Sequence, residues 1–344
     1  MANVSSLRIW FQYGVVILVV CSVLAYLLIT STVNQNAGMV PEEPIVYSFQ
    51  DVVWRRNFTL CNRQYLKTLK SMHYFLKGTI PYSFGNLTIY IYNPQTDLIS
   101  NETNSKNVYK PWVFNTIYKY IQNDTSIGVI DIGAKSGIYS LPLARLGRKV
   151  VAVETIYQHI QHLCASVIEN KLTNQISIVY NALNNNHLDV PLTFQRGWLD
   201  FGYVKQRKER SVKEMLGKPN NLYRKHQETI KTATLNDFLS LAEVHAMKKV
   251  FITMDVQGYE QKVIEGSNHL FSAKKLIGVY MKWYNHGNTI PSGLLHRFNE
   301  WGYEPFYCNK IFNFDNPCQK IDVYKSGFQY DGIIWLPRKK LGQI

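Results

Sequence analysis

The sequence is poor in acidic residues and cysteines, and it lacks the short motifs of several enzyme classes. It has 24 Asp and Glu against 38 Lys and Arg, a formal net charge of +14, and only five cysteines. No C-x-x-C pair or His/Cys cluster has zinc spacing, so we expect no structural metal. No D-x-D sequence occurs, which disfavours a metal-dependent nucleotide-sugar enzyme. The complete G-x-G-x-x-G fingerprint of dinucleotide sites is missing as well.

What is present indicates an α/β domain with a large core. The chain has 344 residues, 46% of them hydrophobic, enough for one domain of about 200–250 residues and an appendage. Apolar runs predict strands that alternate with helices, the βαβ rhythm of a doubly wound sheet. The strands are expected at 127–132, 149–154, 176–180, 249–254 and 276–282, and the helices at 137–147, 156–171 and 259–271.

The first of these strands ends in a glycine-bearing turn. Gly133 and Gly137 would let this turn pass close to a ligand, and Glu154 ends the next strand where an acid can accept hydrogen bonds from a ribose. Ligands of open α/β sheets bind beyond the carboxyl ends of the strands, so Asp131, Glu154 and Asp255 are expected to converge. For Asp131 and Glu154 an ordinary helix cap or surface acid is the alternative.

Several motifs in this order resemble the FkbM-type family of S-adenosylmethionine-dependent methyltransferases. The match rests on Asp131, Gly133, Ala134 and Gly137, then on Glu154, Thr234-Leu-Asn-Asp237, Asp255, Gly258 and Glu260. The resemblance implies a Rossmann-like, class I, mostly parallel seven-stranded sheet, closed by an antiparallel pair near 303–307 and 330–336. It also implies S-adenosylmethionine as cofactor, bound by Asp131, Gly133, Ala134, Gly137, Glu154, Thr155 and Ala182.

The implied reaction needs little covalent help from the protein. A sulfonium carries an activated methyl group, so the protein must align the acceptor, exclude water and, for a hydroxyl, remove a proton. Asp255 is the first candidate for the catalytic group and His286 the second, although a loop histidine is more often merely solvated. Glu260 could equally be a first-turn acid that favours the helix dipole.

Four positions depart from the family pattern. Lys135 replaces a usual asparagine, Thr155 stands where proline is common, Gln257 replaces an acid, and Lys282 lies where the next strand often ends in glutamate. The charge of Lys135 would oppose a sulfonium if its side chain entered the pocket, and the sequence leaves its direction open. These departures motivate a second hypothesis, a catalytically inactive methyltransferase-fold protein that serves as a lumenal binding or scaffold module.

An uncharged segment precedes the domain. Residues 9–30 would form a single transmembrane helix of roughly 30 Å, longer than the h-region of a cleaved signal peptide, so we favour a retained signal-anchor. Arg8 lies before this segment, whereas Glu42 and Glu43 are the first charges after it. The positive-inside rule then predicts a type II protein of the Golgi or endoplasmic reticulum, with a cytosolic tail (1–8), a stem (31–46) and a lumenal domain.

Residues 47–124 are interpreted as a glycosylated N-terminal extension of the methyltransferase-like domain at 125–344. Chance sequons are the alternative in this asparagine-rich chain, but four lie in this one segment, at Asn57, Asn86, Asn101 and Asn123. The four cysteines outside the anchor, Cys61, Cys164, Cys308 and Cys318, could form two disulfides in an oxidising lumen, and Cys308–Cys318 is the first expected pair. Cys164, on a predicted helix, could remain a buried free thiol.

A basic insertion at 196–231 carries much of the excess positive charge. It could attract a phosphorylated, sulfated or uronic-acid sugar, although a solvated loop is the alternative. Nucleic acid is disfavoured because the domain is expected in the lumen. The sequence therefore predicts a membrane-anchored methyltransferase that acts on a hydroxyl of a glycan or glycoconjugate, and it does not identify the acceptor.

Overall fold

The structure, a computed structural model, describes residues 43–57, 59–71, 75–95, 97–105, 108–194, 202–204, 228–283, 290–308, 318–321 and 332–338. These residues belong to one unit, Glu42–Ile344. No helix within these ranges is long and apolar enough to cross a membrane. The anchor expected at 9–30 lies outside the described residues and stays a prediction.

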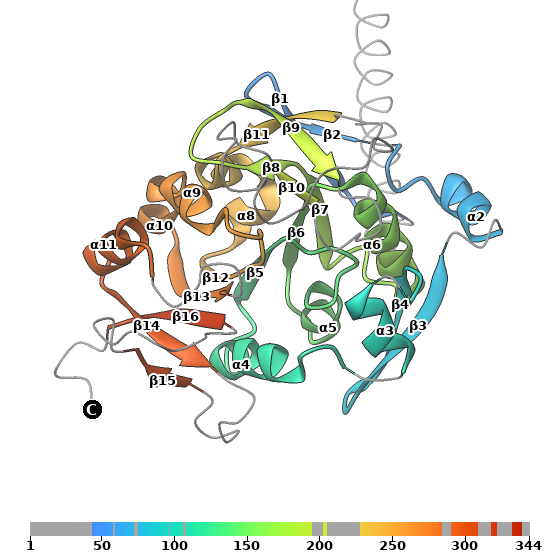
Figure 1. The fold of residues 1–344 in the computed structure, drawn as a ribbon, viewed down its shortest axis with the longest axis horizontal. Helices are drawn as coiled ribbons and strands as arrows, with labels where there is room; N and C mark the ends of the chain where they lie inside the picture. Colours follow the sequence, from blue (N-terminus) through green and yellow to red (C-terminus); the bar gives the residue numbers. More distant parts are fainter. Residues whose placement is uncertain are drawn as a thin grey trace, which may run out of the picture. The chain divides into compact units, whose positions relative to one another are not determined.

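Ten strands of the described residues form one sheet at the centre of this unit (Figure 1). Its middle consists of five adjacent parallel strands in the order β7-β6-β5-β12-β13. Their sequences are almost continuously apolar because helices cover both faces of the sheet. The strands expected from the sequence are confirmed, with the bounds β5 Ile127–Ile132, β6 Val150–Glu154, β7 Ile176–Tyr180, β12 Lys249–Met254 and β13 Lys275–Lys282.

The sheet closes with the antiparallel pair that was expected. β16 (Gly332–Pro337) runs antiparallel between β13 and β14 (Tyr303–Cys308). A short strand, β15 (Cys318–Lys320), lies outside β14. The fold is therefore a Rossmann-like α/β fold with a mostly parallel sheet, as predicted.

The opposite edge of the sheet was not anticipated. β1 (Val46–Gln50) pairs parallel with β7, and β2 (Val53–Arg56) pairs antiparallel with β1. The sheet thus has ten strands where seven were expected. Two of the added strands come from the segment interpreted as an extension, so this segment is in part continuous with the sheet.

Helices cover both faces of the sheet (Figure 1). On one face, three helices pack on side chains such as Val129 and Ala152, and on the other face five helices pack on side chains such as Ile130 and Val153. The first group is α4 Pro111–Ile121, α5 Ser140–Arg145 and α6 Tyr157–Glu169, and the second is η1 Leu235–Ser240, α8 Ala242–Ala246, α9 Glu260–Glu265, α10 Asn268–Ala273 and α11 Ser292–Glu300. The single helix expected at 259–271 is two helices, divided near Gly266, where an added Cβ would lie 2.5 Å from the backbone oxygen of Asn184.

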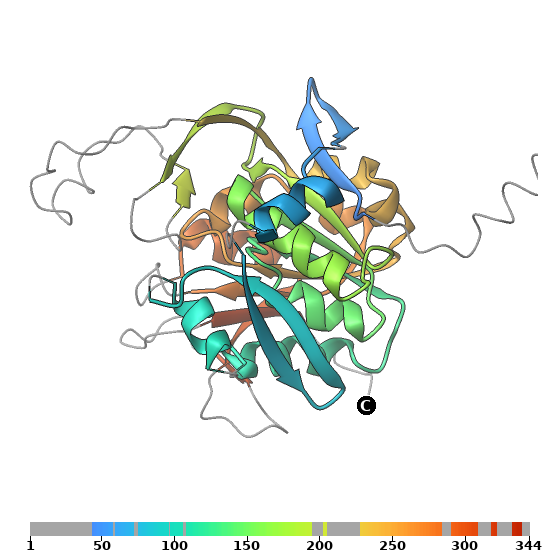
Figure 2. The ribbon, with the colours of Figure 1, turned by 90° about the vertical axis from the view of Figure 1, so that its right-hand side faces the viewer.

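A hairpin of β3 (Leu76–Tyr82) and β4 (Gly85–Ile91) lies across α6 (Figure 2). Side chains of α6 and the residue after it accept hydrogen bonds from the backbone of β4. Tyr90 N donates to Ser166 Oγ at 2.9 Å, and Thr88 N donates to Asn170 Oδ1 at 3.0 Å. These bonds satisfy strand-edge groups that would otherwise need water or another strand.

Two further parts complete the described unit. Helices α2 (Arg63–Ser71) and α3 (Leu98–Asn104) flank the hairpin in the chain, and a second sheet has the order β10-β9-β11-β8. The strands of this sheet are β8 Ala182–Leu183, β9 Asp189–Phe194, β10 Gly202–Val204 and β11 Glu228–Ala233. Most of the basic insertion at 196–231 lies outside the described residues.

A disulfide joins Cys61, just before α2, to Cys164 in the middle of α6, with a Cα–Cα distance of 5.3 Å. The alternative of a free Cys164 thiol is therefore wrong, and the bond agrees with the expectation that the four cysteines could form two disulfides. Cys318 is also disulfide-bonded, and its backbone lies opposite that of Cys308. The expected Cys308–Cys318 bond stays a prediction because the side chain of Cys308 lies outside the described part.

Candidate functional site

A cavity of about 120 Å³ lies at the carboxyl ends of β5, β6 and β12. The expected convergence of Asp131, Glu154 and Asp255 is confirmed, since all three line it. It arises because parallel neighbouring strands place their carboxyl ends at one edge of the sheet. Six of the predicted site residues line the cavity, namely Asp131, Gly133, Glu154, Thr155, Ala182 and Asp255.

The turn after β5 passes so close to the end of β12 that only glycine fits at its start. Gly133 has φ +84°, and an added Cβ would lie 2.1 Å from the backbone oxygen of Asp255. Its N–H donates to Val153 O at 2.9 Å, which ties the turn to the neighbouring strand β6. The backbone therefore forms one wall of the cavity without a side chain in the way.

Glu154, the last residue of β6, is buried and is held in its ionised form. Its Oε2 accepts a hydrogen bond from Lys135 N at 2.8 Å, and its Oε1 accepts from Thr155 N at 2.7 Å and Ile156 N at 2.8 Å. His159 Nδ1 lies 3.4 Å from Oε1. Burial opposes ionisation, but His159 and the backbone donors more than offset it, so the pKa of Glu154 lies below its ordinary value.

Asp131 is the contrasting acid of the same cavity. It is only 2% exposed, and its carboxylate accepts a hydrogen bond from Ser140 Oγ at 2.5 Å. Burial, with smaller contributions from Asp255 and Glu154, raises the pKa of Asp131 to about 7 despite the hydroxyl donor. Asp131 therefore exchanges a proton near neutral pH.

Asp255 is contacted by two of the residues that depart from the family pattern. Lys282 Nζ donates to Asp255 Oδ2 at 2.7 Å, and Gln257 Nε2 donates to Oδ1 at 2.7 Å. Partial burial raises the pKa of Asp255, while Lys282 acts in the opposite direction. The side chain remains 30% exposed, so it can meet a second ligand beside the cavity.

Lys135 is among the residues that line the cavity, and its side chain turns toward the protein and not toward solvent, being 11% exposed. Its Nζ forms an ion pair with Asp97, whose side chain is fully buried at the start of α3. The other carboxylate oxygen of Asp97 accepts a hydrogen bond from Ser100 N at 2.6 Å and caps that helix. The positive charge of Lys135 is therefore balanced within the protein before any ligand binds.

Two predicted site residues lie away from the cavity wall, and a third is not described. Ala134 is buried and its N–H donates to Val153 O at 3.0 Å, so it supports the turn from behind and is not among the residues that line the cavity. Gly137, with φ +95°, lies against Leu163 of α6, and an added Cβ would be 2.7 Å from that side chain. His286 lies outside the described residues.

Two other motif residues of the sequence, Glu260 and Asp237, stabilise the local backbone through hydrogen bonds. Glu260, buried in the first turn of α9, accepts a hydrogen bond from Val256 N at 3.2 Å and fixes the turn after β12. Thr234 and Asp237 form a reciprocal capping box at the start of η1.

The sequence reasoning missed several residues of the cavity wall. His159 could have been found, because it lies one turn into the helix that follows Glu154. Tyr139 could have been found by similar reasoning, because it follows the glycine turn. Ile99 and Tyr109 also line the cavity, and they come from the segment interpreted as an extension. Their contribution depends on long-range packing that leaves no local pattern.

No protein-family model and no curated protein matches the chain. Solved structures similar to it include the precorrin-6y C5,15-methyltransferase from Geobacter metallireducens GS-15, with 12% identity, coverage of 66% of this chain and 88% of that chain, and a TM-score of 0.33. Others are the O-methyltransferase from Bacillus cereus in complex with SAH (12%, 66% and 80%, TM-score 0.32) and the CcbJ methyltransferase from Streptomyces caelestis (10%, 66% and 89%, TM-score 0.34). At these TM-scores the likeness carries no argument about this chain, and the function is argued from its own site.

Proposed function

We propose that this chain is an S-adenosylmethionine-dependent methyltransferase of the FkbM type that methylates a hydroxyl of a glycan or glycoconjugate in the secretory pathway. The observation that carries the proposal is the convergence of Asp131, Glu154 and Asp255 around one cavity at the carboxyl ends of β5, β6 and β12. This is where an open α/β sheet binds a nucleoside ligand.

The chemistry of the cavity fits this cofactor. Glu154 is ionised at the end of β6, where it could accept hydrogen bonds from the two ribose hydroxyls. Gly133 lets the ligand approach the backbone closely, and Ala182 and Leu183 offer an apolar surface for a base. The carboxyl groups favour a cationic sulfonium, and the nearby cations Lys135 and Lys282 are each paired with a carboxylate.

When bound, S-adenosylmethionine would supply an activated methyl group. The protein would then have to hold the acceptor hydroxyl in line and take its proton. Asp255 suits the second task because its carboxylate is partly exposed and its pKa is raised above the ordinary value. Lys282 and Gln257 fix the orientation of that carboxylate.

Two features support a lumenal, type II placement. The Cys61–Cys164 disulfide is typical of an oxidising compartment. Three of the four sequon asparagines, Asn86, Asn101 and Asn123, are exposed in the described structure. Asn57 is half-buried, and its Oδ1 accepts a hydrogen bond from Thr59 Oγ1 at 2.8 Å, so we expect it to be the least glycosylated. The N-terminal segment at 9–30 would supply the membrane anchor.

A second candidate is a catalytically inactive binding module with the same fold. The observation that favours it is the engagement of both Asp255 oxygens by Lys282 and Gln257. If these contacts persist with an acceptor present, Asp255 cannot act as a base. The cofactor would still bind under this hypothesis, but no methyl group would be transferred.

The test measures transfer of tritiated methyl from labelled S-adenosylmethionine by the full-length protein to a panel of neutral, uronic-acid and sulfated oligosaccharides. We expect transfer to at least one class, and a fall of about 100-fold in Asp255→Asn with retained binding of S-adenosylhomocysteine. Asp189→Asn, an exposed acid on β9, is the matched control and should retain activity. Binding without any transfer would favour the inactive module, and absence of binding would contradict both.

A further inference from the structure

A separate hollow of about 390 Å³ lies between α2 and the end of α6. Its described lining contains four cationic side chains, Arg63, Lys67, Lys70 and Lys171, and a single acidic one, Glu169. Most charged runs on a protein surface are simply solvated. Here the charged side chains line a hollow, where several of them can contact one ligand.

The cations of α2 form one face of the helix. Arg63, Lys67 and Lys70 are spaced at i, i+4 and i+7, and α2 contains no acidic residue. Leu66, between them, is 2% exposed and fixes this face toward the hollow and the core. The Cys61–Cys164 disulfide holds the start of α2 against α6. The cations therefore stand on a fixed wall.

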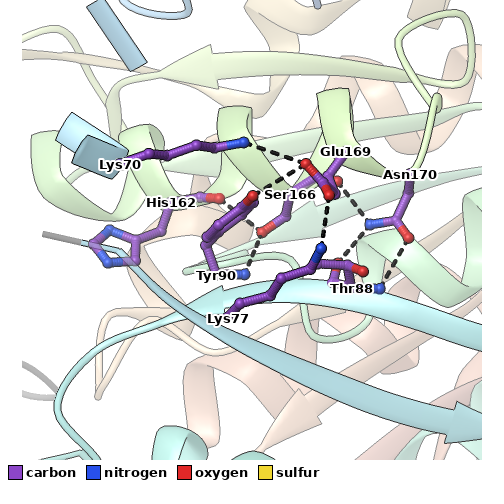
Figure 3. A network of polar contacts seen from close by, with 8 residues as sticks. All are labelled: Lys70, Lys77, Thr88, Tyr90, His162, Ser166, Glu169 and Asn170. Atoms are coloured by element: carbon purple, nitrogen blue, oxygen red, sulfur yellow. Dashed lines mark hydrogen bonds and ion pairs between the residues drawn. The ribbon is translucent and has the colours of Figure 1, made fainter. Parts of the chain in front are cut away.

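Glu169 occupies the opposite wall and is already neutralised (Figure 3). It accepts hydrogen bonds from Lys77 Nζ at 2.8 Å, Tyr90 Oη at 3.0 Å and Lys70 Nζ at 3.2 Å. The hydrogen bond from Lys77 is the largest cause that lowers the pKa of Glu169 to about 2, so its charge is constant in any physiological medium. Two lysines thus balance this one carboxylate, and Lys67 and Lys171 are exposed around the same hollow.

The lining of the hollow also contains three aliphatic residues, Leu66, Ala165 and Ile168. Leu66 and Ala165 are 2% and 1% exposed, so the half-buried Ile168 is the one that offers apolar surface. Sugar rings combine an apolar C–H face with polar substituents, so cations around a hollow with one accessible aliphatic side chain match a sugar that carries sulfate or carboxylate groups. Electrostatic attraction to the cations would be the main source of affinity for such an oligosaccharide.

We propose that the hollow between α2 and α6 binds an acidic oligosaccharide, a chain with sulfate or carboxylate groups. A flat anionic membrane fits less well, because the cations line a hollow and not a flat surface. Binding of the oligosaccharide does not depend on the proposed function. A role for the oligosaccharide as the methyl acceptor rests on that function.

The hollow and the candidate cofactor cavity are connected by the helix α6. His159, near the start of α6, lines the candidate cofactor cavity, and Glu169, at the end of α6, lines the hollow. Ten residues of helix place them roughly 15 Å apart along its axis. An extended oligosaccharide is long enough to occupy the hollow and approach the cavity together, so binding here would favour acidic polymers over short neutral acceptors.

The experiment measures binding of a fluorescent heparin octasaccharide to the full-length protein by anisotropy, without cofactor and at several salt concentrations. The test variant is Arg63→Gln/Lys67→Gln/Lys171→Gln. The matched control, Lys248→Gln/Lys274→Gln/Lys275→Gln, removes the same charge near the starts of β12 and β13. Lys67→Glu/Lys171→Glu is a second test variant that changes only exposed side chains. Vesicles containing phosphatidylserine form a parallel arm.

We expect both test variants to bind the octasaccharide about tenfold more weakly, and the control to remain within about twofold of wild type. Equal loss in the control would show attraction by net charge alone and overturn the proposal. Absence of binding to wild type would also overturn it, as would a loss confined to the vesicle arm. Titration with S-adenosylhomocysteine in all variants separates this result from a failure of the proposed function.

Discussion

The candidate cofactor cavity and the hollow between α2 and α6 have opposite charge, although the same helix, α6, contributes to both. In the cavity, acids predominate; its cation Lys135 is paired with Asp97, and Lys282, beside the cavity, is paired with Asp255. In the hollow, cations predominate and the acid Glu169 is paired with lysines. A chain with a net charge of +14 thus keeps one region suited to a cation and another suited to an anion.

The largest expected effect concerns the buried ion pair of the cavity. Lys135→Met would leave the fully buried carboxylate of Asp97 without its cation, and we expect a loss of about 3–5 kcal/mol in the free energy of unfolding. Urea denaturation of the variant checks this value. The double variant Lys135→Met/Asp97→Asn should recover much of the loss. The single variant Asp97→Asn is measured as well. If the double variant loses as much free energy of unfolding as the two single variants together, the two side chains are not coupled.

The next effect concerns the backbone wall. Gly133→Ala would place a Cβ 2.1 Å from the backbone oxygen of Asp255 in a left-handed conformation, so we expect a loss of roughly 2–4 kcal/mol and loss of cofactor binding. Gly147→Ala is the matched control, because Gly147 has a similar φ of +82° with nothing within 4 Å of the added Cβ. Thermal unfolding of Gly147→Ala should show a decrease of about 1 kcal/mol in the free energy of unfolding. Equal costs at both glycines would contradict the close approach.

Asp131 gives the cavity a pH dependence that the hollow lacks. Burial raises the pKa of Asp131 from 3.8 to about 7, so between these values the folded protein holds a proton that the unfolded chain has lost. Stability from this group is complete below about pH 4 and is lost as the pH rises toward 7. Asp131→Asn stays neutral at every pH. As the pH rises from about 4 to 7, its free energy of unfolding should therefore increase relative to wild type by on the order of 2–4 kcal/mol. Denaturation at several pH values measures the difference, and a constant difference would exclude the assignment.

The smallest effect is expected at the hollow. Lys77 and Glu169 are 57% and 31% exposed, so water screens their ion pair. Lys77→Met should therefore cost less than about 1 kcal/mol, well below the cost of Lys135→Met. The two variants measured side by side test the contrast between the regions. A cost at Lys77 equal to that at Lys135 would remove the distinction between a buried pair and a surface pair.

Much of the fold was accessible from the sequence because its signals are local. The apolar runs of β5, β6 and β12 identify buried parallel strands, and their order then places Asp131, Glu154 and Asp255 at one edge. The strand β1 was missed because its pairing with β7 joins residues about 130 positions apart. Nothing in the local pattern of 46–50 indicates that partner.

The details of the site depend on similar long-range contacts. Asp97 and Lys135 are separated by 38 residues, and no helix or strand period connects them. The cationic face of α2 could be read from the spacing of Arg63, Lys67 and Lys70, but the opposite wall of the hollow comes from α6. Sequence patterns therefore predict the elements and the edge of the sheet that binds, whereas the partners of individual charges require the folded structure.

The most direct test of the central claim is calorimetric titration of the full-length protein with S-adenosylhomocysteine. Glu154→Gln removes the ionised carboxylate at the end of β6, and Glu300→Gln, an exposed acid on α11, is the control. We predict binding by wild type and by the control, and a loss of about 100-fold in affinity in a folded Glu154→Gln protein. Unchanged affinity in Glu154→Gln, or no binding by wild type, would contradict the assignment of the cavity.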